Sequence, residues 1–168
     1  MSNLNSLNNR INIRQISIGV LGLLIGTLVY LVDRPPDQTY FVYSIPFHIS
    51  LFKTLPNLFG PIGKSLPSFI HVFSFILLTA GIISSRKKGF LIVCLCWFIV
   101  DCIFELGQKF NSLSLKTIPG WFSGIPILEN TRNYFIHGTF DFNDLVAISV
   151  GTIAAYFVLL STAKGVGG

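Results

Sequence analysis

Four long apolar segments, separated by polar or proline-containing stretches, set the hydrophobic pattern of this chain. They cover residues 16–32, 66–84, 90–107 and 144–163. A helix rises about 1.5 Å per residue and the hydrocarbon core of a bilayer is about 30 Å thick, so each segment is long enough to cross a membrane as a helix. The pattern therefore predicts an all-α bundle of four transmembrane helices, built as one domain from residues 1–168.

The two long connections, residues 37–66 and 109–142, are rich in aromatic and aliphatic side chains. Prolines and glycines interrupt the first connection, which predicts that it does not span the membrane. Its stretch 47–55 has the composition of a short amphipathic turn in the membrane interface. The second connection is long enough to contain structure of its own or to act as a lid. Its expected anchors at the headgroup level are Trp121, Phe122, Tyr134 and Phe135.

Three glycines, Gly19, Gly22 and Gly26, lie along one side of the first segment when it is helical. Small residues at this spacing let two helix backbones approach closely in a membrane. The pattern therefore predicts a helix contact at this face. Its partner is either another helix of this chain or a helix of another membrane protein subunit.

The composition supports the membrane assignment, because 51% of the residues are hydrophobic and only 11% are charged. Soluble domains carry about 25% charged residues. The formal net charge of +5 raises the question of a nucleic-acid partner. The basic residues, however, lie at the ends of the apolar segments, where they act as topology signals. We therefore expect membrane lipids, and no nucleic acid, as partners.

The basic residues also predict the orientation of the bundle. Four spans place both termini and the short connection between the second and third segments on one side of the membrane. The positive-inside rule makes this side the cytoplasm, so the long connections lie outside. The basic residues on the predicted cytoplasmic side are Arg10, Arg14, Arg86, Lys87, Lys88 and Lys164.

The three cysteines, Cys94, Cys96 and Cys102, all lie in the third segment. Their spacing is typical neither of a disulfide framework nor of a metal site. We interpret them as small apolar residues and predict no metal site from them.

Polar residues gather toward the predicted outer side of the bundle. In the third segment three of them follow the spacing i, i+4 and i+7, which places them on one helix face. A carboxylate near the middle of a membrane costs about 2.5–3.5 kcal/mol, so this face is expected to meet protein or trapped water. The sequence predicts an outward-opening polar pocket formed by His71, Asp101, Glu105, Gln108, Asp141 and Asp144.

Each of these residues also has a structural interpretation. Asp101, Glu105 and Gln108 can form hydrogen bonds between helices, and His71 can do the same. Asp141 or Asn143 can cap the last helix, and Asp144 in its first turn can complement the helix dipole. The two remaining histidines, His48 and His137, fall in the connections and are expected to be solvated.

Several short motifs together resemble the VanZ-like family of bacterial integral membrane proteins. They are a histidine near the outer start of the second helix (His71), Glu105-x-x-Gln108 at the end of the third, and the segment 139–145 (TFDFNDL), with Gly151 seven residues after Asp144. The family commonly has an adjacent Asp-Glu pair before x-x-Gln, whereas this chain has Phe104 there and Asp101 one turn earlier. Gly138 and Ile148 replace an arginine and an asparagine of the family pattern. The resemblance implies a bacterial inner-membrane protein connected with the cell envelope.

Three functions are compatible with these observations. In the first, the pocket binds the headgroup of a lipid or a lipid-linked envelope precursor, directly or through a divalent cation on its phosphate. In the second, the chain is an enzyme that uses His71 and Glu105 as an acid–base pair on such a substrate. In the third, it is a small accessory subunit of a larger membrane complex. The sequence assigns no catalytic residue and no cofactor.

Overall fold

The computed structural model describes residues 11–33, 58–83, 87–125 and 128–163. The interfacial turn predicted at 47–55, with His48, lies outside the described residues. So does the side chain of His137.

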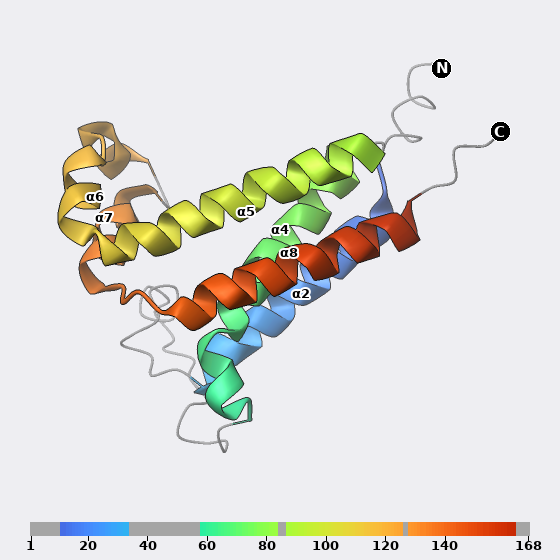
Figure 1. Cartoon of the computed structure of the whole chain (residues 1–168), viewed down its shortest axis with the longest axis horizontal. Coiled ribbons are helices and arrows are strands. Elements are labelled where there is room, and N and C mark those ends of the chain that lie inside the picture. Colours follow the sequence, from blue (N-terminus) through green and yellow to red (C-terminus); the bar gives the residue numbers. More distant parts are fainter. Residues whose placement is uncertain (1–10, 34–57, 84–86, 126–127, 164–168) are drawn as a thin grey trace.

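Four long helices make up most of the described chain (Figure 1). They are α2 (Ile13–Asp33), α4 (Leu66–Ile83), α5 (Lys87–Lys109) and α8 (Phe142–Thr162). All four are long enough and apolar enough to cross a membrane, which confirms the predicted number of long apolar helices. No strand occurs among the described residues. Helix α5 begins at Lys87 rather than Phe90, because polar residues are tolerated in a first turn that extends beyond the apolar core.

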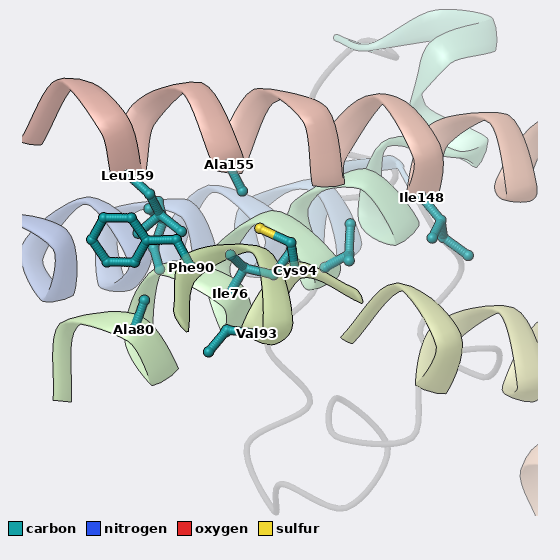
Figure 2. Packing of buried hydrophobic residues seen from close by; sticks show 10 residues of the cluster. Ile76, Ala80, Phe90, Val93, Cys94, Ile148, Ala155 and Leu159 are labelled. Carbon is teal, nitrogen blue, oxygen red and sulfur yellow. The ribbon is translucent and has the colours of Figure 1, made fainter. Parts of the chain in front are cut away.

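Helix α4 lies at the centre of the arrangement and contacts α2, α8 and α5. The main apolar core forms where α4, α5 and α8 meet (Figure 2). There Phe90 of α5 lies beside Leu159 of α8, and Cys94 of α5 lies near Ala155 of α8. In Figure 1, α5 diverges from α2 and α4 toward the end that carries the short helices. The bundle is therefore closed at one end and wider at the other.

The glycine face of α2 packs against α4 of the same chain. A Cβ atom on Gly19 would lie 3.0 Å from the Ser74 backbone oxygen, and one on Gly26 would lie 3.0 Å from Ile70 Cγ2. A Cβ atom on Gly22 would collide with the Ser74 hydroxyl. The predicted close contact is thus made within the chain. Because α4 covers this face, the interpretation of Gly19, Gly22 and Gly26 as a docking surface for another subunit loses its basis.

A group of polar contacts, here called the polar clasp, joins three helices at the closed end. The Asn12 backbone N–H donates to the Gly81 carbonyl at 2.8 Å, and Asn12 Nδ2 donates to the Thr162 carbonyl at 2.9 Å. Gln15 Nε2 donates to Thr162 Oγ1 at 3.1 Å. The clasp fixes the start of α2 against the ends of α4 and α8. The hydropathy pattern did not predict these polar contacts, because it shows where apolar segments lie and not which polar groups meet.

The connection between α5 and α8 contains short helices: α6 (Asn111–Thr117), the 3-10 helices η3 (Gly120–Gly124) and η4 (Leu128–Asn130), and α7 (Thr131–His137). Phe135 of α7 is buried, and its ring stacks on Phe104 with 5.8 Å between the ring centroids. The interpretation of Phe135 as a headgroup anchor is therefore wrong, because its ring holds α7 against α5. Trp121 is 62% exposed and can still serve as an anchor.

Candidate functional site

The two carboxylates of α5 are buried, although they lie in an apolar helix. Asp101 is 7% exposed and Glu105 is 4% exposed, and one helical turn separates them. Both side chains have partners on other elements, as buried charged groups require. The partner of Asp101 lies on α4, whereas the partner of Glu105 lies in the backbone that leads into α8.

Asp101 pairs with His71 of α4. The distance between His71 Nδ1 and Asp101 Oδ2 is 3.1 Å. The His71 side chain is 51% exposed, and its ring packs against Phe75 with 4.5 Å between centroids. Nearby, Trp97 Nε1 donates to Thr79 Oγ1 at 2.9 Å. Together these contacts join α4 to α5 along one side of the bundle.

Glu105 contacts the backbone that leads into α8. Its Oε1 accepts a hydrogen bond from the Asp141 backbone N–H at 2.9 Å. His71 therefore pairs with Asp101 in this structure, and not with Glu105 as the proposed acid–base pair required. The reason is geometric, since Glu105 lies one turn further along α5 and faces the start of α8.

Asp141 caps α8, and is thus the one of the two cap candidates in the sequence that takes this role. Its Oδ1 accepts hydrogen bonds from the Asn143 backbone N–H at 2.9 Å and from Asn143 Nδ2 at 3.0 Å. Asp144 follows in the first turn, where the helix dipole favours a negative charge. Its Oδ1 atom is buried and has no hydrogen-bond partner among the described residues. Asp141 and Asp144 both lie close enough to act electrostatically on Glu105.

Gln108 forms a third, separate contact. Its side chain lies close enough to Tyr134 of α7 to act on the Tyr134 phenol, and a Cβ atom on Gly138 would lie 2.8 Å from Gln108 Cδ. Gly138 therefore leaves the space that the Gln108 side chain fills. Burial raises the pKa of Tyr134 to about 12, and the negative charge of Glu105 adds to this shift. The phenol therefore stays protonated well above the pH at which an ordinary tyrosine ionises.

An open cavity of about 550 Å³ lies beside these contacts, between η2 (Gly60–Lys64) and the first turns of α4 and α8. Asp33, the last residue of α2, anchors the approach to η2, because its two carboxylate oxygens accept the backbone N–H groups of Leu58 and Phe59, each at 3.1 Å. The polar lining residues are Lys64, Ser65, Asp141 and Asn143. The apolar ones are Pro61, Ile62, Leu66, Phe69, Val146, Ala147 and Val150.

Of the six residues predicted to share one pocket, Asp141 alone lines this cavity. Asp101 pairs with His71, and Glu105 accepts a hydrogen bond from the Asp141 backbone. Gln108 lies beside α7. The residues expected to form one pocket wall instead make separate contacts between elements, and only the Glu105 contact reaches a residue that lines the cavity. Lys64 and Asn143 were not predicted. Asn143 was considered only as a possible helix cap, whereas Lys64 carried no local signal.

The described residues contain no group of three or more His, Cys, Asp and Glu side chains placed to hold a metal ion. The cysteines are free thiols: Cys94 is buried, Cys102 is half-buried and Cys96 is exposed.

Comparison with family models, with curated proteins and with solved structures finds no match to this chain. The resemblance to the VanZ-like family thus rests on the short motifs alone.

Proposed function

We propose that this chain is a VanZ-like protein of the bacterial cell envelope that binds the headgroup of a lipid or lipid-linked precursor at the outer end of its bundle. The observation that carries the proposal is the cavity between η2, α4 and α8. Its lining is mostly apolar, and its polar residues come from the start of α8 and the end of η2. Sites for small ligands typically combine an apolar wall with a few polar groups in this way.

The cavity suits an amphiphile because its apolar wall is open to the surroundings of the bundle. Val146 is 47% exposed and Val150 is 51% exposed, so this side of α8 faces lipid when the helix spans a membrane. An acyl chain beside Val146 and Val150 would bring its headgroup to Asp141 and Lys64. The ligand would then enter sideways from the bilayer.

Glu105 supports this site without lining it. Its hydrogen bond to the Asp141 backbone fixes the residue that caps α8 and faces the cavity. Because Glu105 is buried, a change there would act on ligand binding through the position of Asp141. Glu105 is therefore a positioning residue in this proposal.

The test is to fill the cavity and measure the lipid that stays bound after purification. Ala147→Trp places an indole in the cavity, and Ile153→Trp adds the same group to an exposed position of the same helix. We expect Ala147→Trp to retain about tenfold less of a defined lipid than the unchanged protein, equivalent to a loss of about 1.4 kcal/mol. Ile153→Trp should retain the same amount as the unchanged protein. Mass spectrometry of the extracted lipids provides the measurement, and equal retention by both variants would contradict the proposal.

A further inference from the structure

The cavity has one cationic and one anionic lining residue, which come from distant parts of the chain. Lys64 ends η2, and Asp141 precedes the first turn of α8. Among the described residues that line the cavity, they are the only charged ones. A ligand headgroup there would meet opposite charges from two different elements.

Asp141 retains hydrogen-bonding capacity toward this cavity. Both hydrogen bonds that its side chain accepts from described residues go to Oδ1. An ionised carboxylate has about four acceptor positions on its two oxygens, so Oδ2 can accept further donors. The backbone of Asp141 is held by Glu105, which limits the movement of the side chain. A donor group in the cavity would thus find an acceptor in a fixed place.

Lys64 supplies the complementary chemistry. Its ammonium group has three donors and no acceptor, which suits a phosphate oxygen. The residue is exposed at the cavity rim, and the hydrogen bonds from Leu58 and Phe59 to Asp33 hold the backbone that leads into η2.

We infer that the headgroup bound here carries both a phosphate and a primary amine, as in an aminophospholipid such as phosphatidylethanolamine. This inference rests on the proposed lipid-binding function and names its ligand class. The amine donates to Asp141, the phosphate accepts from Lys64, and the acyl chain lies beside Phe69 and Val146. A trimethylated amine has no N–H to donate, and a glycerol headgroup has no positive charge for Asp141.

The experiment offers three lipids that differ only in their headgroups. Purified, delipidated protein is placed in mixed vesicles or nanodiscs that contain equal amounts of phosphatidylethanolamine, phosphatidylcholine and phosphatidylglycerol with identical acyl chains. The lipids that remain bound are then counted by native mass spectrometry. We expect about tenfold enrichment of phosphatidylethanolamine over phosphatidylcholine, which is the size of effect that one charge-assisted hydrogen bond produces.

Three variants assign the effect to its residues. Asp141→Asn keeps a good helix cap and its backbone N–H, so the fold is preserved while the negative charge is lost. This variant should lose the preference for phosphatidylethanolamine. Lys64→Gln should lower the retention of all three phospholipids alike, because each carries a phosphate. Glu129→Gln removes an exposed carboxylate that does not line the cavity and should change nothing.

Each other outcome has a clear meaning. Equal retention of phosphatidylethanolamine and phosphatidylcholine, or an unchanged preference in Asp141→Asn, would overturn the inference and leave the proposed function standing. If the unchanged protein retains none of the three lipids in any mixture, the inference is overturned together with the lipid-binding function on which it rests.

Discussion

Asp101 is a buried carboxylate in an apolar helix, and its partner in this structure is a half-exposed histidine on the neighbouring helix. Such a group is stable only if a hydrogen-bond or charge partner compensates for the loss of water. His71 meets this need at 3.1 Å and thereby links α4 to α5 where the two helices diverge. We conclude that the pair stabilises the wider end of the bundle.

This role predicts a coupling between the two side chains. His71→Leu should lower the free energy of unfolding by about 1–3 kcal/mol, because it leaves Asp101 buried without its partner. In the background of Asp101→Leu the same change should cost clearly less, since no carboxylate remains to be compensated. Thermal unfolding in detergent of the two single variants and the double variant measures this coupling. Equal costs of His71→Leu in both backgrounds would show that the pair contributes nothing.

The sequence predicted which residues share a face of α5 but not which partners they meet. Helical spacing places Asp101, Glu105 and Gln108 on one side of α5 whatever surrounds it. Their partners, however, lie on α4, on the start of α8 and on α7, and only the crossing of these elements decides between them. The cap at Asp141 could be predicted because it depends on residues two positions away. Lys64 could not, because its position depends on the anchor at Asp33, far away in the chain.

Helices α2 and α4 approach each other through glycine, where lipid gives no hydrophobic drive for association and close van der Waals packing must provide it. Gly19 meets the Ser74 backbone oxygen of α4, and a backbone atom cannot move aside as a side chain can. The closeness of the two helices therefore depends on the missing side chain.

A bulky residue at this contact should force the helices apart. We expect Gly19→Leu to destabilise the protein by about 1–3 kcal/mol through overpacking, although leucine is the better helix former. Ser17→Leu adds a similar side chain to an exposed position of the same helix and should be nearly neutral. Unfolding of both variants in detergent gives the comparison. A Gly19→Leu protein as stable as Ser17→Leu would mean that the α2–α4 contact tolerates separation.

The long helices were predictable because their apolar lengths match the thickness of a bilayer. The short helices of the connection from α5 to α8 were not predictable in the same way. A helix as short as α6 or α7 is marginal on its own in water. Helix α7 is held by its packing, since Phe135 stacks on Phe104 and closes over Gly107. The sequence shows the aromatic residues but not the surface that receives them.

The molecule as a whole has two different ends. At one end the polar clasp and the core around Phe90 and Leu159 bring the helices together (Figure 2). At the other end lie the cavity, the carboxylates of α5 and the start of α8. In the proposed function, the lipid binds at the wider end while the clasp keeps the helices in register at the other.

The basic residues at the end with the polar clasp predict which end of the bundle faces the cytoplasm. Arg14, Lys87 and Lys88 lie in the first turns of α2 and α5 at this end, and basic residues in such short flanking segments are retained on the cytoplasmic side.

In a variant with alanine at Cys94, Cys96 and Cys102, we expect Ser123→Cys to react with a membrane-impermeant maleimide in intact spheroplasts, because η3 lies at the opposite end. A cysteine appended after Gly168 should react only after lysis. Protection of Ser123→Cys until lysis, with labelling of the appended cysteine beforehand, would reverse the orientation and place the cavity on the cytoplasmic leaflet. Since the two leaflets differ in composition, that result would also change which lipids can reach Asp141.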